Sequence, residues 1–518
     1  MAAKSPPRLS AAAFDRAVKA FEGAVGKDWT LVTEADRDSY LDVYPLEQPR
    51  RHLPMGAVAP ASAAEVQAVV RLANQHKIPL WPISRGKNYG YGGSAPMTTD
   101  AMVLDLSRMK KIIEVDPTLA YAALEPGVGF FDLFEHLQTN KIPLWISAPG
   151  NSWGSVIGNA LEHGNAGTPY GDHATQLCGM EVVLPTGEMV RTGMGAMANS
   201  PTFHLARHGY GPTLDLMFTQ SNYGVVTKAG FWLMPEPPAT LTMQIELPNQ
   251  NDVIWLVDVL TRLRIDGVIQ QNPTIRNFLR VAAIQSQRSE WYQGEGPMPE
   301  EVGRAMREKL GLGWWNVAVT LYGYEEVNDI HAKVIEAAFR PHTDRPFTRT
   351  TWRKGEPVEK SGHQGIPSVR PLGAVNWRGG RGAHIGFSPV LPASGKHAYD
   401  WFLKAKALME QHGFDYYGAF NVQERNITKV TLIYYDRDDP KMVANLEALF
   451  HAMIAEARKL GYAEYRTHLD FMDEVMDTYD YNGHAFRKLS EKIKDALDPN
   501  GIIAPGKQGI WPKRYRAT

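Results

Sequence analysis

Two short apolar segments, each running directly into a glycine-rich loop, limit most strongly how this chain can fold. The first is IPLWPIS (78–84) followed by RGKNYGYGG (85–93), and the second is IPLWIS (142–147) followed by PGNSWGSVIGN (149–159). Short apolar runs bounded by turn residues predict buried strands. Glycines let backbone N–H groups approach a ligand, and runs of N–H groups form anion-binding hollows. One such loop is equally compatible with a flexible turn, but the pair, with Arg85 and Lys87 beside it, favours a pyrophosphate.

Two segments also match the dinucleotide-binding pattern G-x-G-x-x-A, namely 90–95 and 193–198. This pattern indicates a Rossmann unit only where a strand precedes it and a helix follows. The first match continues into PMTTD (96–100) and a strand, and the second follows a predicted hairpin and enters a loop. A Rossmann fold is therefore not expected.

The order of the remaining elements predicts two α+β domains. A chain of 518 residues is long for one domain. The proline-rich segment PEPPAT (235–240) lies between two regions that differ in their pattern of predicted strands and helices, and it indicates a domain boundary. We expect the C-terminal tail to return to the first domain. The predicted division is 1–236, 237–460 and 461–518. Helices are expected at 13–22, 130–140, 251–264, 325–339, 397–413 and 441–461, and strands at 101–107, 111–116, 120–127, 180–193, 224–235, 241–247, 315–323, 383–390 and 429–436.

Charge and cysteine content exclude several classes of protein. Lys and Arg number 55 against 56 Asp and Glu, so the chain lacks the basic footprint of a nucleic-acid-binding or membrane-surface protein. Cys178 is the single cysteine, which excludes an intrachain disulfide and a cysteine-based zinc cluster. His204 and His208 have helical i, i+4 spacing without the glutamate of a metalloprotease, so no metal site is expected. Without a signal-like or membrane-spanning run, the expected location is the cytoplasm.

Seven segments together resemble the vanillyl-alcohol oxidase / p-cresol methylhydroxylase family of flavoproteins, with vanillyl-alcohol oxidase and eugenol oxidase as the nearest members. The resemblance runs in the same order from about residue 55 to the C-terminus. The segments are WPISRGKNYGYGGSAP (81–96), TPYGDH (168–173), MEVVLPTGEMVRTGMGA (180–196), TQSNYGVVTKAG (219–230), GAHIGFSPV (382–390), EYRTHLDFMD (464–473) and DPNGIIAPGKQGIWP (498–512).

The resemblance implies an FAD-binding domain of two α+β subdomains, interrupted by an inserted α+β cap domain that contacts the substrate. It also implies that His384 carries the flavin through a covalent bond. The implied FAD contacts are Ser84, Arg85, Gly86, Lys87, Asn88, Gly90, Gly92 and Gly93 of the first loop, Pro149, Gly150, Gly154, Ser155 and Asn159 of the second, and Val225, Thr227, His384 and Lys507.

The resemblance further implies that Tyr91, Tyr465 and Arg466 bind the phenolate of a para-substituted phenol. Two phenol hydroxyls and a guanidinium can all donate to one phenolate oxygen and favour the anion. The expected reaction is hydride transfer from the benzylic carbon to the flavin, giving a p-quinone methide that adds water, loses a proton to form an alkene, or is oxidised further. Relatives are dimers or octamers, so a homodimer is expected.

Position 150 departs from the family pattern. Vanillyl-alcohol oxidase and eugenol oxidase carry an aspartate directly after the proline, where this chain has Gly150 after Pro149. Their aspartate acts in water activation and flavin attachment. Three interpretations follow: a base supplied from elsewhere, a different fate of the quinone methide, or, favoured here, a roomier site for a larger substituent. The histidine that assists flavin attachment in vanillyl-alcohol oxidase also has no counterpart near Tyr44 and Pro45.

Three rival functions stay open at this point. The first is a dehydrogenase of the same fold that passes electrons to a cytochrome c or a copper protein, although Pro149 beside the flavin favours O2 as acceptor. The second is a flavin oxidase of another substrate class, such as a hydroxy acid. The third is a flavin-binding protein without turnover, which the change at Gly150 keeps open.

Overall fold

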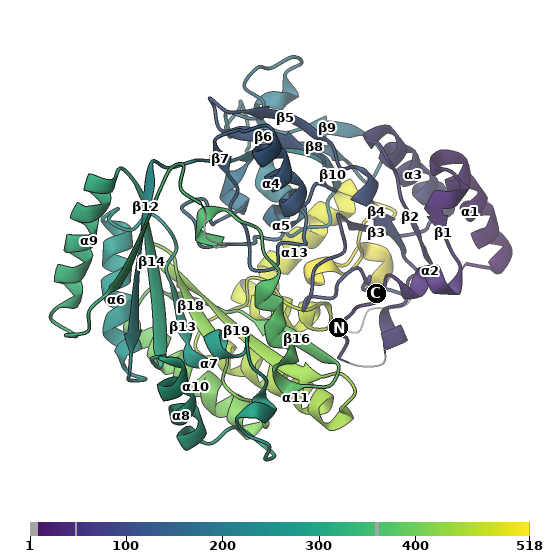
Figure 1. The fold of residues 1–518 in the computed structure, drawn as a ribbon. Coiled ribbons are helices and arrows are strands. Elements are labelled where there is room, and N and C mark those ends of the chain that lie inside the picture. The colour runs from purple at the N-terminus through teal and green to yellow at the C-terminus, as the bar shows by residue number, and fades with distance from the viewer. Residues whose placement is uncertain (1–8, 47–48, 358–361, 517–518) are drawn as a thin grey trace.

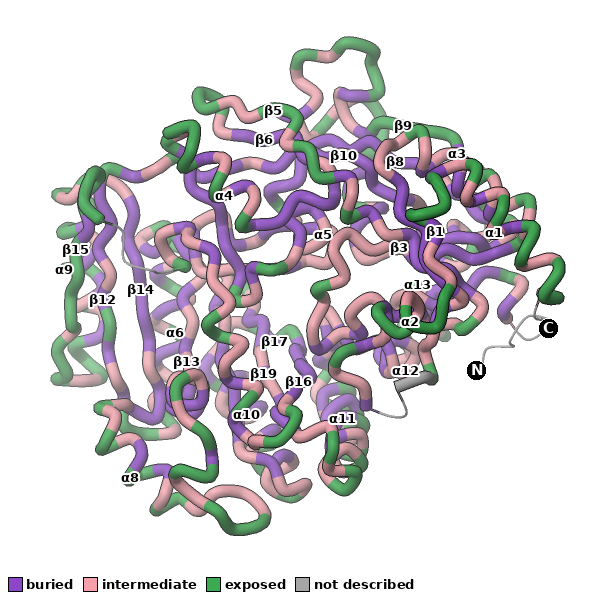
Figure 2. The backbone as a smooth tube through the Cα atoms, turned by 45° about the vertical axis from the view of Figure 1, so that its right-hand side comes forward, coloured by how far each residue is buried: buried purple, intermediate pink, exposed green. Residues whose placement is uncertain are grey.

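The structure is a computed structural model that describes residues 9–46, 49–357 and 362–516. Two bodies lie side by side, one formed by the N-terminal part with the C-terminal segment and the other built on one large sheet (Figure 1). Buried backbone runs through both, because each has its own apolar core (Figure 2). The mixture of helices and sheets confirms the α+β prediction. Among the described residues, no helix has the length and apolar character needed to span a bilayer.

The first body contains a partly parallel sheet and an antiparallel sheet. The first sheet has the order β1 (Thr30–Leu31), β2 (Gly56–Val58), β4 (Met102–Asp105) and β3 (Leu80–Ile83), with β2, β4 and β3 parallel. The second has the order β5 (Ile112–Asp116), β6 (Tyr121–Leu124), β10 (Val225–Trp232), β8 (Leu177–Val183) and β9 (Met189–Arg191). A short pair joins β11 (Met234–Pro235) to β7 (Leu144–Trp145). The helices are α1 (Ala11–Val25), α2 (Glu34–Asp38), α3 (Ala63–His76), α4 (Phe130–Thr139) and α5 (Val156–Leu161).

Both glycine-rich loops follow strands, as the sequence predicts. The first leaves β3 and the second follows β7. Ser62 caps α3 by accepting the N–H of Glu65 at 3.2 Å. Both loops lie at the side of this body that faces the large sheet, where they line one cavity together with strands of that sheet (Figure 1).

The second body is an antiparallel sheet with helices packed on one face. Its strand order is β15 (Thr348–Arg353), β12 (Ala239–Leu247), β14 (Trp315–Gly323), β13 (Thr274–Asn277), β18 (Gly418–Val422), β19 (Asn426–Asp436) and β16 (Gly382–Phe387), with β17 (Val390–Pro392) beside β19. Its helices are α6 (Asp252–Ile265), α7 (Phe278–Ala282), α8 (Glu300–Leu310), α9 (Glu325–Phe339), α10 (Gly395–Gln411) and α11 (Pro440–Lys459). Ile275 of β13 belongs to the core under these helices, whereas its neighbours Thr274 and Arg276 face the opposite side.

Several elements of this body are not predicted from the sequence. The structure adds β13, β15, β18, α7 and α8, and β15 lies within a stretch that has no regular apolar period. Five of the six residues of β15 are exposed, because it is an edge strand paired on one side only. Its sequence therefore lacks the apolar alternation that marks a half-buried strand.

The C-terminal segment, which contains α12 (Met472–Thr478) and α13 (Tyr481–Leu497), returns to the first body. The N–H of Leu80 in β3 donates to the carbonyl of Ile502 at 2.7 Å, and the N–H of Ala504 donates to the carbonyl of Leu80 at 2.8 Å. The tail thus extends the first sheet beside the first glycine-rich loop. On this basis we propose the division 1–236, 237–460 and 461–518, since the large sheet is built from residues between 239 and 436.

A buried ion pair fixes the returning tail. The ammonium of Lys494 lies 2.7 Å from Asp498, and neither side chain is exposed. Lys494 also donates to the carbonyls of Asn222 and Ile503 at 2.6 Å, while Asp498 accepts the N–H groups of Ile502 and Ile503 at 2.8 Å. Both charges are therefore satisfied by groups from three separate segments.

We expect Lys494→Met to lower the free energy of unfolding by about 3–5 kcal/mol, because it leaves the Asp498 carboxylate buried without its partner. Urea unfolding of the purified protein measures this change. The matched control is Lys396→Met, which breaks an exposed pair with Asp400 and should leave stability nearly unchanged. Equal effects of the two substitutions would contradict the prediction.

Candidate active site

A cavity of about 810 Å³ is lined by the loops of the first body, by the face of the large sheet that is not covered by helices, and by the C-terminal segment. This volume lies in the range of ligand and cofactor sites. Most of the site residues predicted from the sequence line it. They are Ser84, Gly86, Lys87, Asn88, Tyr91, Gly92, Gly93, Pro149, Gly150, Gly154, Ser155, Asn159, Val225, His384, Tyr465, Arg466 and Lys507.

Three of the predicted residues are absent from the cavity wall. Arg85 turns away and its guanidinium lies 2.5 Å from the carboxylate of Asp132. Gly90 lies behind His384, and Thr227 is buried and donates to the carbonyl of Glu181 at 3.2 Å. The structure thus gives Arg85 and Thr227 partners within the protein.

The first glycine-rich loop is pressed against elements from far along the chain. Gly90 and Gly92 have φ values of 81° and 102°, a conformation that favours glycine. A Cβ at Gly90 would lie 3.0 Å from Nε2 of His384, and one at Gly92 would overlap the side chain of Leu469. Glycine is therefore required at both positions for the loop to reach β16 and the segment that carries Tyr465.

The second loop is held by a helix cap and leaves space at Gly150. The hydroxyl of Ser155 donates to the carbonyl of Pro126 at 2.5 Å and accepts the N–H of Gly158 at 3.0 Å at the start of α5. Among the residues that the structure describes, a Cβ at Gly150 would meet only Pro371, at 3.8 Å. The missing aspartate therefore leaves open volume on the cavity wall.

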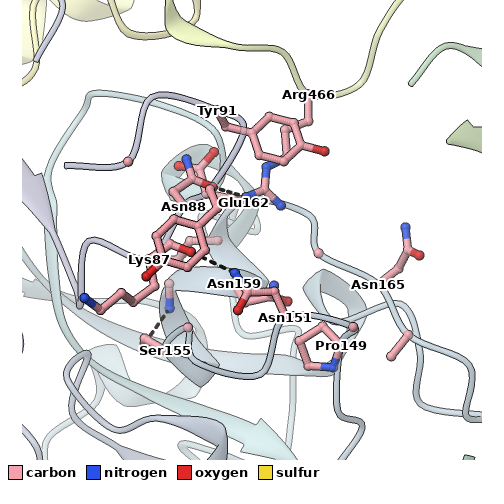
Figure 3. Close-up of a pocket in the computed structure, with 18 of the residues that line it drawn as sticks. Lys87, Asn88, Tyr91, Pro149, Asn151, Ser155, Asn159, Glu162, Asn165 and Arg466 are labelled. Carbon is pink, nitrogen blue, oxygen red and sulfur yellow. Dashed lines mark hydrogen bonds between the residues drawn. The ribbon is translucent and has the colours of Figure 1, made fainter. Parts of the chain in front are cut away.

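Tyr91, Tyr465 and Arg466 come together on one side of the cavity. The guanidinium carbon of Arg466 lies 4.1 Å from the centre of the Tyr91 ring, and the guanidinium donates to the side-chain carbonyl of Asn88 (Figure 3). Burial raises the pKa of both tyrosines, although the charge of Arg466 opposes this effect. Both hydroxyls consequently keep their protons near neutral pH and can donate them to an anion.

A buried carboxyl group lies directly beside this cluster, and sequence reasoning did not single it out. Glu464 is buried and accepts the backbone N–H of Ser388 at 2.7 Å. Burial raises its pKa to about 8. A neutral Glu464 avoids placing a negative charge next to the site where Tyr91 and Tyr465 would hold an anion.

His384 projects from β16 into the cavity as a neutral imidazole. Burial lowers its pKa to about 4, and the negative charge of Asp42 only partly offsets this shift. Its Nδ1 is buried without a hydrogen-bond partner. The rings of Tyr44 and Tyr434 lie 5.2 and 6.0 Å from it. The sequence has no histidine near Tyr44, and the Tyr44 ring itself contacts His384.

A chain of alternating histidines and aspartates lies behind the first loop. His468 lies 2.8 Å from Asp42 and 3.3 Å from Asp470, which in turn lies 2.8 Å from His52. Burial alone would lower the pKa of His468, but the hydrogen bonds and charges of the two aspartates outweigh it and raise the pKa to about 9. His468 is therefore a buried cation that joins the segment after Arg466 to the chain around Asp42.

The cap side of the cavity contributes polar residues, two of them arginines, that the sequence reasoning missed. Arg276, Arg280, His363 and Asn421 line the wall opposite the glycine-rich loops. In the sequence, Arg276 falls in TIRN, a four-residue strand with no distinguishing motif. Only the pairing of β13 with β14 and β18 places it at the cavity.

Known proteins match this chain along nearly its whole length. Residues 54–193 match the model of an FAD binding domain, and residues 374–508 match the C-terminal domain of FAD linked oxidases. The 4-cresol dehydrogenase [hydroxylating] flavoprotein subunit of Pseudomonas putida is 37% identical over 511 residues, which cover 98% of this chain and 97% of that protein. The chain belongs to the vanillyl-alcohol oxidase / p-cresol methylhydroxylase family of flavoproteins. It is an FAD-linked oxidoreductase, and FAD is its cofactor.

Solved structures of this flavoprotein family agree with the fold. A 4-ethylphenol oxidase from Gulosibacter chungangensis, in complex with isoeugenol, superposes with a TM-score of 0.94 at 35% identity, covering 99% of this chain and all of that one (100%). Substrate-bound p-cresol methylhydroxylase gives a TM-score of 0.93 at 36% identity, covering 98% of both chains. The expected FAD-binding architecture is thereby confirmed.

The residues present fit FAD. The two loops offer glycines and the cation of Lys87 to a pyrophosphate, and His384 lines the same cavity from the large sheet. Lys507 lines the same cavity and is ion-paired with Glu162.

The His468 network predicts a pH-dependent stability. Because the folded-state pKa of His468 is raised from 6.5 to about 9, its contribution is complete below pH 6.5 and is lost as the pH rises through about 9. We expect the unfolding free energy to fall by about 1–3 kcal/mol across this window. The His468→Gln variant should lose this slope, whereas His451→Gln, at a half-exposed histidine, should keep it. Urea unfolding of the FAD-bound protein at pH 6.5 and 9.5 measures both; an unchanged slope in His468→Gln would refute the assignment.

Proposed function

We propose that the protein oxidises para-substituted phenols that carry a 4-alkyl, 4-alkenyl or 4-hydroxymethyl group. The observation that carries this proposal is the meeting of Tyr91, Tyr465 and Arg466 at the cavity. The named relatives, a 4-cresol dehydrogenase subunit and a 4-ethylphenol oxidase, act on phenols of this class and support it. A hydroxy acid would need cations for its carboxylate at this position, where two of the three groups are phenols.

The three side chains bind and activate the substrate. The hydroxyls of Tyr91 and Tyr465, which burial keeps protonated, donate to the phenol oxygen, and Arg466 adds a positive charge. Charge-assisted hydrogen bonds lower the pKa of the bound phenol, so the phenolate forms. Its negative charge pushes electron density toward the benzylic carbon, which makes a hydride easier to lose. FAD, when bound, would supply the acceptor for this hydride.

Loss of the hydride leaves a p-quinone methide, an electrophile. Addition of water gives a benzylic alcohol, loss of a proton gives an alkene, and a second oxidation gives a carbonyl compound. The open volume at Gly150 favours substrates with a larger benzylic substituent, because only Pro371 lies within 4 Å of a Cβ built there.

We further propose that His384 forms a covalent bond to the flavin. A nucleophile must be unprotonated, and burial keeps the His384 imidazole neutral. His384 lines the cavity in which the flavin would bind. The proposed FAD contacts also include the loop glycines, Lys87, Ser155, Asn159, Val225 and Lys507, which all line the cavity.

The proposed electron acceptor is O2, with Pro149 on the cavity wall beside Gly150. The alternative is a dehydrogenase that passes electrons to a cytochrome c or copper protein, and the description of the Pseudomonas putida relative as a flavoprotein subunit supports it. A cytoplasmic location and a homodimer remain predictions.

We expect the purified protein to oxidise 4-ethylphenol, and Tyr91→Phe to lower kcat/KM by about 10- to 150-fold, the effect of losing a hydrogen bond to a charged group. The control Tyr210→Phe, at a fully exposed tyrosine, should match the wild type. Oxygen uptake and reduction of added cytochrome c, measured side by side, distinguish the two acceptors. Full activity of Tyr91→Phe would exclude the phenolate mechanism.

We expect acid precipitation of the protein to give a yellow pellet, because a covalent bond to His384 keeps the flavin on the denatured chain. In His384→Asn the flavin absorbance should move to the supernatant. Flavin in the supernatant of the wild type would show that FAD is dissociable and that His384 only contacts it.

A further inference from the structure

Two arginines of the cap reach the cavity from the wall opposite the glycine-rich loops. Arg276 lies on β13, where the alternation of the strand turns Thr274 and Arg276 to the cavity and Ile275 to the core. Arg280 lies four residues later, in α7, and lines the same cavity. Both positions are set by the large sheet rather than by a mobile loop.

Neither guanidinium has an acidic partner among the residues that the structure describes. No carboxylate there lies within ion-pair distance of Arg276 or Arg280, although Arg288 and Arg378 nearby in the same body share Asp415. The Nη1 of Arg280 is buried and has no hydrogen-bond acceptor among the residues that the structure describes. Burial and the charge of Arg280 lower the pKa of Arg276 to about 10, so it stays protonated at neutral pH. Both side chains are partly buried on the cavity wall, and cations in this position favour the binding of an anion.

The position of the two arginines relates them to the substrate rather than to the pyrophosphate loops. Arg280 is close enough for its charge to act on Tyr91 and His384. Arg276 lies on β13, which is separated from the His384 strand by β18 and β19, a distance of about 14 Å at the usual strand spacing. The pair therefore extends along the sheet, away from the phenolate cluster.

The charges on the cavity wall are unbalanced. The cations are Lys87, Arg276, Arg280, Arg370, Arg466 and Lys507. The one acidic residue among the described lining residues is Glu162, and it is paired with Lys507. A pyrophosphate at the loops and a phenolate at Arg466 leave the two cap arginines without a counter-ion.

We propose that Arg276 and Arg280 form an anion subsite that binds a carboxylate on the para side chain of the substrate. A carboxylate accepts paired N–H bonds from a guanidinium, and the subsite would hold this end while Tyr91, Tyr465 and Arg466 hold the phenolate. The substrate class is then a 4-substituted phenol with an acidic side chain. This inference rests on the proposed function and specifies its substrate.

The test compares acids with their uncharged primary amides, which have nearly the same shape. The substrates are 4-hydroxyphenylacetic, 3-(4-hydroxyphenyl)propionic and 4-(4-hydroxyphenyl)butyric acid. We expect kcat/KM for the best acid to exceed that for its amide at least tenfold. Arg276→Met and Arg280→Met should each lower the ratio of kcat/KM for the acid to kcat/KM for its amide about tenfold or more. Arg280→Lys, which keeps the charge, should retain part of the preference, and Arg345→Met, at an exposed arginine of the cap, should have no effect.

Binding is measured separately by calorimetric titration of 3-phenylpropionate, which lacks the phenol that oxidation requires. It should bind the wild type and bind Arg280→Met at least tenfold more weakly. Oxidation of neutral phenols with no preference for acids, or equal binding of 3-phenylpropionate to both proteins, would overturn the subsite while the proposed function stands. Loss of FAD from Arg276→Met or Arg280→Met would also overturn it, because the arginines would then serve the cofactor. Failure to oxidise any phenol would refute the proposed function, and the titration alone would then decide the subsite.

Discussion

The site depends on the close contact of the first glycine-rich loop with two distant segments. Gly90 approaches the His384 imidazole so closely that a Cβ would be only 3.0 Å from it, and Gly92 approaches Leu469 at a distance that no Cβ would allow. These two contacts join the first body to the large sheet and to the segment that carries Tyr465 and Arg466. Without these contacts, the residues proposed to bind flavin and phenol would not meet at one cavity.

Burial determines the chemistry of the groups that meet there. It keeps Tyr91 and Tyr465 protonated, keeps His384 neutral, and raises the pKa of Glu464 to about 8. In each case desolvation disfavours the charged form. His468 is the exception, because two aspartates hold its proton. The cavity thus combines neutral donors with guanidinium charges, which suits anionic ligands along its length.

The change at Gly150 fits this view of the cavity. Vanillyl-alcohol oxidase and eugenol oxidase carry an aspartate at this position, whereas Gly150 leaves open volume and adds no negative charge. On the cap side, Arg276 and Arg280 face the cavity without acidic partners among the described residues. A cavity wall with a glycine in place of the aspartate and with two arginine cations is the arrangement expected for a larger, acidic substrate.

The sequence by itself determined the two strand–loop units, the α+β composition and, through its resemblance to the family, the part of the cavity wall formed by the two glycine-rich loops, His384 and the segment around Tyr465. Local patterns are enough for these features because the glycine loops and long amphipathic helices carry their own periodicity. The tertiary structure decided the rest. Short strands such as β13 and β15 are defined by pairing with their neighbours, so the role of Arg276 was invisible in its four-residue segment. The turning of Arg85 toward Asp132, the contact of Tyr44 with His384 and the raised pKa of Glu464 depend likewise on residues far apart in the chain, since burial and close contact exist only after folding.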